Sequence, residues 1–143
     1  MGLDVGQRRI GVAISDASRT LARPVGVIRT TALNAAAVEQ VVDELARLGA
    51  EDDEIGTIVV GLPRRLDGTP NDMTAPVEHF AAQLQLRTTL PVVLQDERLT
   101  SREAESRLAE REKDWKARKQ KLDAAAAAII LQDYLDAPHP PTP

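Results

Sequence analysis

The sequence LDVGQRRIGVAIS, residues 3–15, joins two short runs of strand-forming residues through a turn. Leu3 to Val5 reads as the stub of one strand, and Gly6 marks a tight turn after it. Arg9 to Ser15 is rich in β-branched residues and alternates, which is the pattern of a second strand. Residues 24–29, PVGVIR, predict a third strand. We therefore expect these three strands to pair as an antiparallel meander.

The rest of the chain alternates between helical and strand patterns. Residues 35–48 carry apolar side chains at helical spacing, whereas residues 57–62, TIVVGL, form an apolar run that is typical of a strand covered on both faces in a parallel sheet. The remaining predicted elements are a helix over 73–86, a strand over 91–94, a helix over 100–111 and a final helix over 122–135. This order predicts an α/β fold in which helices cover both faces of a mixed five-stranded sheet.

The composition sets limits on the class of protein. The chain has 143 residues, no cysteine and a formal net charge of −4 at pH 7. Its length predicts one domain over residues 1–136, followed by a Pro-rich flexible tail over 137–143. The missing cysteines exclude disulfides, zinc–thiolate sites and thiol nucleophiles. Because the sequence shows neither a secretory signal nor the ~20 apolar residues of a membrane span, we expect a cytoplasmic protein without a membrane partner.

Three acidic residues fall at the ends of predicted elements. Asp4 closes the first strand, Glu97 lies just past the fifth, and Asp123 opens the last helix. In open α/β sheets, ligands bind outside the strand ends, where such side chains can converge. Carboxylates are preferred ligands of Mg²⁺ and Mn²⁺, and two such ions can promote hydrolysis of a phosphodiester. The three acids are therefore candidate metal ligands and catalytic residues.

Each acid also has a purely structural interpretation. Asp4 could shape the turn before Gly6, and Glu97 could be a solvated loop residue. Asp123 could favour a helix start through the helix dipole, an effect of about 0.3–1 kcal/mol. Taken singly, Glu97 and Asp123 favour the structural interpretation. Gly61 also has two interpretations: it either marks the end of a strand or leaves space for a close neighbour.

A basic segment lies directly before Asp123. Residues 111–121 include Lys116, Arg118 and Lys119, with the single tryptophan of the chain in their middle. Basic side chains bind a nucleic-acid backbone by releasing its counterions, so this segment could lead a phosphate to the carboxylate. A solvated helical connector explains the same residues equally well. Because the net charge is negative, affinity for nucleic acid would depend on such local patches.

Four motifs, in order, resemble those of the YqgF/RuvX family. They are DVGQRRIGVAISD from Asp4 to Asp16; Gly61-Leu62-Pro63 with Asp67-Gly68; DERLTS from Asp96 to Ser101 with Glu103-Ala104; and Asp123 to Ala126 with Ile130 to Leu135. Together they cover nearly the whole chain. The resemblance implies an RNase H-like fold, which is the layout that the predicted strand order suggests.

The same resemblance implies a site and an activity. It implies a nuclease that uses Mg²⁺ or Mn²⁺ held by Asp4, Glu97 and Asp123. It also implies that a nucleic-acid substrate contacts Gly6, Arg9, Arg98 and the basic segment with Lys116, Arg118 and Lys119. The family is described as maturing the 5′ end of 16S rRNA and as resolving Holliday junctions. We expect precursor 16S rRNA as the substrate, with branched DNA as the alternative, and symmetric cutting of a junction would require a homodimer.

Two other function classes fit the sequence. The Asp-Val-Gly turn followed by the Ile-Gly-Val strand also resembles the phosphate-binding hairpin of actin-like ATPases and sugar kinases, which would make the chain a nucleotide-binding module. Alternatively, the chain is a non-catalytic RNA-binding factor that keeps the fold alone. ATP binding by the isolated chain would favour the first class. Salt-sensitive RNA binding without metal-dependent cleavage would favour the second.

Overall fold

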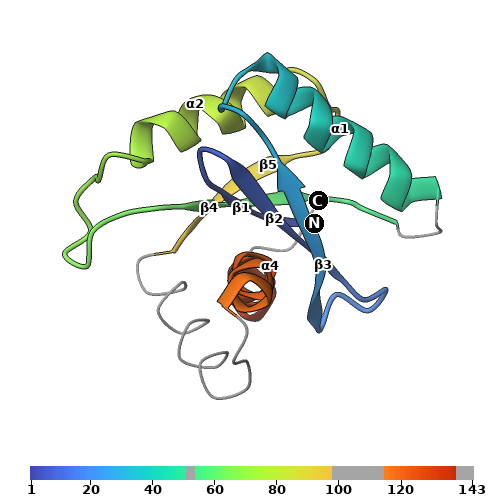
Figure 1. Ribbon diagram of the computed structural model, residues 1–143. Helices are drawn as coiled ribbons and strands as arrows, with labels where there is room; N and C mark the ends of the chain where they lie inside the picture. Colours follow the sequence, from blue (N-terminus) through green and yellow to red (C-terminus); the bar gives the residue numbers. More distant parts are fainter. Residues whose placement is uncertain (51–53, 98–114, 138–143) are drawn as a thin grey trace.

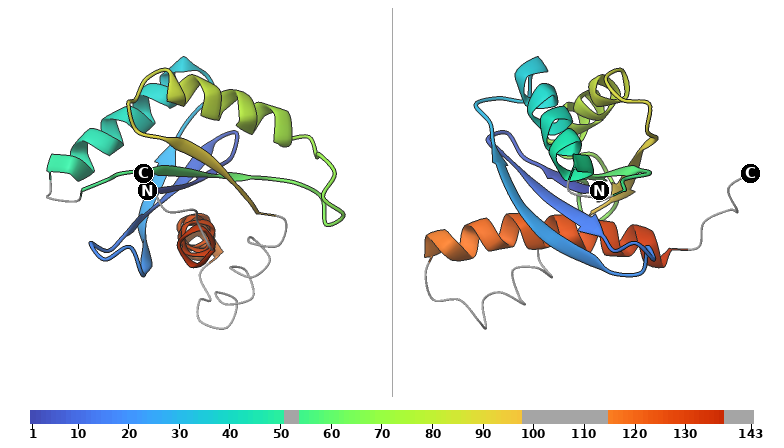
Figure 2. Two further views of the ribbon diagram at one scale, coloured as in Figure 1. Left: turned by 180° about the vertical axis from the view of Figure 1, so that it is seen from behind. Right: turned by 90° about the vertical axis from the view of Figure 1, so that its right-hand side faces the viewer.

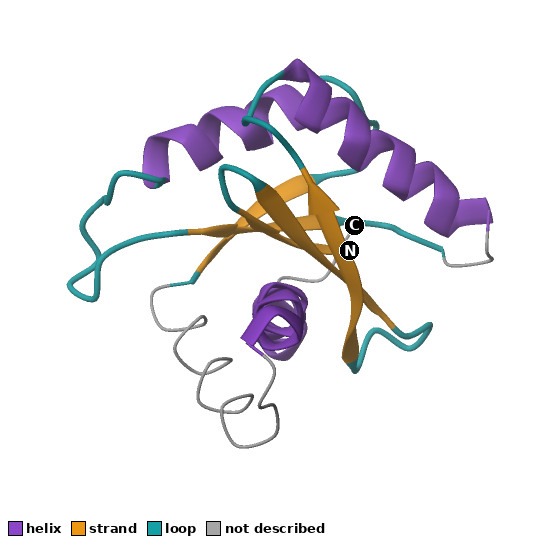
Figure 3. Cartoon of the chain, viewed as in Figure 1, coloured by secondary structure: helices purple, strands orange, loops and turns teal. Residues whose placement is uncertain are grey.

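A computed structural model describes residues 1–50, 54–97 and 115–137 of the chain. Within these ranges the fold has three layers, with helices on both sides of one sheet (Figures 1 and 3). The elements in chain order are β1 (Gly2–Val5), β2 (Arg9–Ser15), β3 (Ala22–Arg29), α1 (Ala35–Ala50), β4 (Ile58–Leu62), α2 (Thr74–Gln85), β5 (Val92–Asp96) and α4 (Trp115–Asp136). Helices α1 and α2 cover one face of the sheet, and α4 covers the other.

The five strands form a mixed sheet in the order β3-β2-β1-β4-β5. Strands β1, β2 and β3 pair as the antiparallel meander that the sequence predicts, whereas β4 pairs in parallel with both β1 and β5. All five residues of β4 are buried, as its apolar run predicts. This is an RNase H-like sheet. Its topology gathers the ends of β1, β3, β4 and β5 and the start of β2 at one edge, which we call the C-terminal edge.

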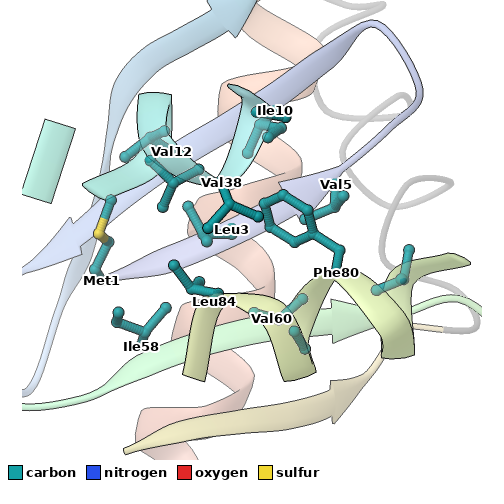
Figure 4. Close-up of a cluster of buried hydrophobic side chains, with 14 of the residues drawn as sticks. Met1, Leu3, Val5, Ile10, Val12, Val38, Ile58, Val60, Phe80 and Leu84 are labelled. Atoms are coloured by element: carbon teal, nitrogen blue, oxygen red, sulfur yellow. The ribbon is translucent and has the colours of Figure 1, made fainter. Parts of the chain in front are cut away.

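The larger core lies between the sheet and helices α1 and α2 (Figure 4). Leu3 and Val5 of β1 point into it and meet Phe80 and Leu84 of α2. Successive side chains of a strand point to opposite faces. Because Leu3 and Val5 face α1 and α2, Asp4 between them faces α4. The alternation of β1 therefore places a carboxylate on the α4 side of the sheet.

Helix α4 packs very closely on its face of the sheet, because a glycine lies beneath it. A Cβ atom on Gly2 would be 2.7 Å from the Cβ of Leu131 and 2.9 Å from the carbonyl oxygen of Ala127. Ala13 and Val59 complete the buried contact between α4 and the sheet. Figure 2 shows α4 extending along this face. The small residues of both partners thus determine how near the helix can come.

Each edge strand is capped at its start by a glutamine side chain from a helix. The Oε1 of Gln132 in α4 accepts a hydrogen bond from the first N–H of β3 at 2.9 Å, and its Nε2 donates to the carbonyl oxygen of Thr20 at 2.9 Å. Gln85 of α2 does the same at β5, where Oε1 accepts from the first N–H of the strand and Nε2 donates to Leu90, both at 2.9 Å. Each glutamine amide group thus makes the hydrogen bonds that a neighbouring strand would otherwise make at this position.

Some predicted boundaries were wrong. Strand β5 continues to Asp96, beyond its predicted end at residue 94, and β3 begins at Ala22 instead of residue 24. Helix α4 begins at Trp115, not at residue 122. Lysine, arginine, glutamine and alanine are good helix formers, so the helix extends beyond the apolar residues that cover the sheet. The predicted helix over 100–111 lies outside the described residues.

The earlier start of α4 affects how Asp123 and the basic segment are interpreted. Asp123 lies inside α4 instead of opening it, so a role at the helix start is excluded. Residues 115–121 of the basic segment belong to the same helix. No helix of the described residues is long and apolar enough to cross a membrane.

The contact between Gly2 and α4 predicts a difference between two strand glycines. Gly2→Ala should lower the free energy of unfolding by about 1–3 kcal/mol, because the new methyl group overlaps backbone and Cβ atoms of α4. Gly26→Ala adds the same group to β3, where nothing lies within 4 Å, and should change stability by less than about 0.5 kcal/mol. Urea unfolding of the two variants measures this difference. Equal stabilities would show that α4 can move away without cost.

Candidate active site

Asp4 and Glu97 come together at the C-terminal edge of the sheet. Asp4 lies near the end of β1, and Glu97 directly follows β5, with β4 between these two strands. The backbone N–H of Glu97 donates to the carbonyl oxygen of Leu62 at 3.2 Å and so continues the ladder between β4 and β5. In the parallel register of β1 and β4, the residue level with Asp4 is Gly61. The two acids therefore flank a position without a side chain.

Gly61 provides the space through which the two carboxyl groups meet. A Cβ atom at this position would lie 2.8 Å from Oε2 of Glu97 and 2.5 Å from Cδ1 of Ile130 in α4. Any larger residue would therefore have to displace both the Glu97 carboxyl group and the Ile130 side chain. Of the two interpretations of Gly61, the structure supports close approach of a neighbour.

The two carboxyl groups share a proton at neutral pH. Burial raises the pKa of Glu97 to about 9, and the charge of Asp4, its hydrogen bond to Glu97 and the charge of Asp96 act in the same direction. Two carboxylates in one poorly solvated site cannot both ionise without a large cost. The pair therefore keeps one proton between its two side chains, and a neighbouring third carboxylate adds to its negative potential.

One oxygen of this pair has no hydrogen-bond partner. The Oε2 atom of Glu97 is buried, and no donor among the described residues reaches it. Buried polar atoms without a partner are rare in folded proteins. A divalent cation would both satisfy this oxygen and replace the shared proton, since carboxylate oxygens are the ligands that Mg²⁺ and Mn²⁺ prefer. The donor chemistry of Asp4 and Glu97 thus fits a metal site.

The described part of the chain does not supply a complete cage for a metal. Within it, no group of three or more Asp, Glu or His side chains gathers closely enough to hold an ion. Asp123 belongs to α4, but its side chain lies outside the description. Further protein ligands would therefore come from such residues, with water completing the coordination.

The other predicted site residues divide into two groups. Gly6 and Arg9 close the turn between β1 and β2, where the Gly6 N–H donates to the Arg9 carbonyl oxygen at 2.8 Å. Arg9 is half-buried as the first residue of β2, so this turn lies at the same sheet edge as the acid pair. Arg98, and the side chains of Lys116, Arg118 and Lys119, lie outside the description, although α4 contains the backbone of these last three.

The mixed five-stranded sheet carries a buried carboxylate pair, with Asp4 in β1 and Glu97 directly after β5, and this combination places the chain in the RNase H-like class of α/β proteins. The chain belongs to the RuvX family, described as Holliday junction resolvase, which it matches over residues 1–137. The family predicted from the four motifs is thereby confirmed.

Curated relatives match nearly the whole chain. A protein of Lactiplantibacillus plantarum named "Putative pre-16S rRNA nuclease" is 43% identical over 137 residues, which cover 95% of this chain and 92% of the relative. A protein of Anaeromyxobacter sp. with the same name is 40% identical over 141 residues, or 97% of each chain. Among solved structures, T. thermophilus RuvC in complex with a Holliday junction substrate covers 94% of each chain, with a TM-score of 0.49 and 16% identity.

The shared proton predicts how the stability of the metal-free protein changes with pH. Because the folded pKa of Glu97 is near 9 and its ordinary value is 4.5, the folded state binds the extra proton between these values. The contribution of this proton to the free energy of unfolding is complete below pH 4.5. As the pH rises towards 9, that contribution is lost by up to about 1.4 kcal/mol per pH unit. Glu97→Gln should lack this loss. Urea unfolding in EDTA at pH 6, 7 and 8 measures it.

The difference between wild type and Glu97→Gln isolates this proton. Burial lowers the pKa of the Met1 amino group to about 6, which makes stability rise with pH over part of the same range. This second effect is common to both proteins and cancels in the comparison. Parallel stability profiles for the two proteins would contradict a proton shared by Asp4 and Glu97.

Proposed function

We propose that this RuvX-family protein is a divalent-metal-dependent endonuclease that hydrolyses phosphodiester bonds during 5′-end maturation of precursor 16S rRNA. The observation that carries the proposal is the buried Asp4–Glu97 pair with its unpartnered oxygen. The names of the curated relatives support both the nuclease activity and the RNA substrate. Mg²⁺ or Mn²⁺ is the proposed ion, because the donor atoms are carboxylate oxygens.

Asp123 is the third proposed ligand, and the course of α4 supports it. Near its C-terminal end, Gln132 contacts the start of β3, at the sheet edge opposite to the acid pair. Further back along the helix, Ile130 meets Gly61 beside Glu97. In the second view of Figure 2 the N-terminal turns of α4 lie on the side of the β1–β2 turn, which supports Asp123 of these turns as a further ligand.

The chain's own residues set the geometry of the reaction. Asp4 is fixed by strand pairing on both sides of β1, so its carboxylate has a defined position at the edge. Glu97 would give up its proton to bind an ion, and both of its carboxylate oxygens could then serve as ligands. Divalent ions held there supply the activation of water and the stabilisation of the leaving oxygen. Basic side chains at the same edge would orient the substrate.

Branched DNA is the second candidate substrate, and the description of the family favours it. Resolution of a four-way junction requires two symmetric cuts and hence two active sites related by a two-fold axis. A junction resolvase would therefore be a homodimer in solution, whereas RNA cleavage needs one site. Light scattering, together with cleavage assays on a four-way DNA junction and a precursor 16S rRNA fragment, separates these candidates.

Removal of one charge at Asp4 should abolish cleavage. Asp4→Asn should lower the Mn²⁺-dependent cleavage rate by about two orders of magnitude or more, because the loss of a metal ligand removes several kcal/mol of charge stabilisation. Asp43→Asn makes the same chemical change on the exposed surface of α1 and should cleave like wild type. Cleavage of labelled precursor rRNA, followed on gels, measures both. Full activity of a folded Asp4→Asn protein would rule out the assigned site.

Metal binding should also be visible without any substrate. Millimolar Mn²⁺ should raise the melting temperature of the wild type, because a ligand that binds the folded state stabilises it. The increase should be larger at pH 8 than at pH 6, because the ion competes with the proton that Glu97 holds up to a pKa of about 9. Glu97→Gln should lose most of the increase at both pH values. An equal increase in both proteins would place metal binding elsewhere.

A further inference from the structure

Four arginines gather at the C-terminal edge beside the acid pair. Arg8 lies in the β1–β2 turn, Arg29 ends β3, and Arg64 and Arg65 follow β4 by one residue. The N–H of Thr30 donates to the Arg8 carbonyl oxygen at 2.9 Å, which joins the first two positions. All four residues are exposed, and none of their guanidinium groups has an ion-pair or hydrogen-bond partner among the described residues. We call Arg8, Arg29, Arg64 and Arg65 the basic rim.

Two of these arginines are held by a well-defined hairpin over residues 64–70. Arg64 forms a β-bridge with Pro70, the Arg65 N–H donates to the Thr69 carbonyl oxygen at 2.9 Å, and the Gly68 N–H donates to the Arg65 carbonyl oxygen at 2.8 Å. Gly68 has a φ of 87°, a conformation that glycine adopts without steric cost. The hairpin is therefore a fixed support for its arginines.

The hairpin is also anchored at its base and at its tip. The buried hydroxyl of Thr74, at the start of α2, donates to the Pro63 carbonyl oxygen at 2.5 Å. At the tip, Oδ1 of Asp67 accepts hydrogen bonds from the N–H of Thr69 at 2.9 Å and from its hydroxyl at 2.6 Å. The one acid of the hairpin is thus used in shaping the turn.

The two arginines of the helical layer are arranged differently. On the helical layer, Arg47 forms an ion pair with Glu44, and Arg87 forms one with Glu39. Arginines without counter-ions beside a site for phosphodiesters are suited to bind phosphate, because the guanidinium group matches two phosphate oxygens. In Figure 1 the β1–β2 turn and the β4–α2 hairpin lie on the same side of the molecule, where β5 also ends.

We propose that the basic rim binds backbone phosphates of the nucleic-acid substrate along the C-terminal edge, with Arg8 and Arg29 at the β2 and β3 end of the edge and the hairpin arginines beyond β4. This inference rests on the proposed nuclease function. The rim would hold the strand so that the phosphate to be cleaved lies over the acids. The rim would also explain how a chain with a net charge of −4 binds a nucleic acid, because the local charge around the site governs the association of the two molecules.

The test compares two double variants with the same change in net charge. Arg64→Gln with Arg65→Gln removes the hairpin charges, whereas Arg47→Gln with Arg87→Gln removes two charges from the helical layer. The probe is a fluorescein-labelled RNA stem with a single-stranded 5′ extension, and binding is measured by fluorescence anisotropy in EDTA to prevent cleavage. The rim variant should bind about tenfold more weakly at 100 mM KCl. Its slope of log affinity against log salt should fall by about 0.7–0.9 for each lost phosphate contact.

Kinetics and a third variant test the other side of the rim. Arg8→Gln should also lower the salt slope, by about one contact. In Mn²⁺, rim variants should raise KM for the RNA with little change in kcat, as expected for residues that position the substrate before the chemical step. The helical-layer variant should match wild type in slope and KM.

The outcomes separate the rim from the proposed function. A wild type that cleaves RNA, with rim variants that keep its salt slope and KM, would overturn the rim while the nuclease assignment stands. A wild type that neither binds nor cleaves RNA or a four-way DNA junction would overturn both. Weaker binding of the rim variants with an unchanged helical-layer variant supports the rim.

Discussion

The close approach of α4 to the sheet is the contact on which the rest of the structure depends. It is possible because Gly2 and Gly61 present no side chain to the helix, so Ala127, Leu131 and Ile130 can pack directly on the strands. The same absence of side chains that admits the helix also opens the space in which the Glu97 carboxyl group reaches across β4. Gly61 therefore sets both the packing of α4 and the position of the Glu97 carboxyl group, and a substitution at Gly61 would disturb both.

The buried acid pair links folding to ligand binding. Burial and the charge of Asp4 keep the pKa of Glu97 high, so the two carboxyl groups can lie together with a proton on the pair. A divalent ion bound there would balance the same negative charge and could take the unpartnered oxygen as a ligand. Binding of such an ion would exchange a proton for a metal at a fixed place in the sheet.

The fold and family were predictable because their signals are local. The stretch from residue 3 to 15 and the apolar run at 57–62 define strand pairing directly, and the meeting of Asp4 with Glu97 follows from strand ends that share one edge. The start of α4 was not predictable, because basic residues form a helix without an apolar period. The basic rim was missed for another reason: Arg8 and Arg64 are distant in sequence and become neighbours of one site only once the strand order is known.

The glutamines at the sheet edges limit how copies of this chain can associate. Free N–H and C=O groups along an edge strand can recruit a strand from another molecule. Gln132 and Gln85 occupy these groups at the starts of β3 and β5, so neither edge offers its full length for such pairing. A homodimer that merged its two sheets would consequently have to pair along only part of β3 or β5, beyond the capped strand starts.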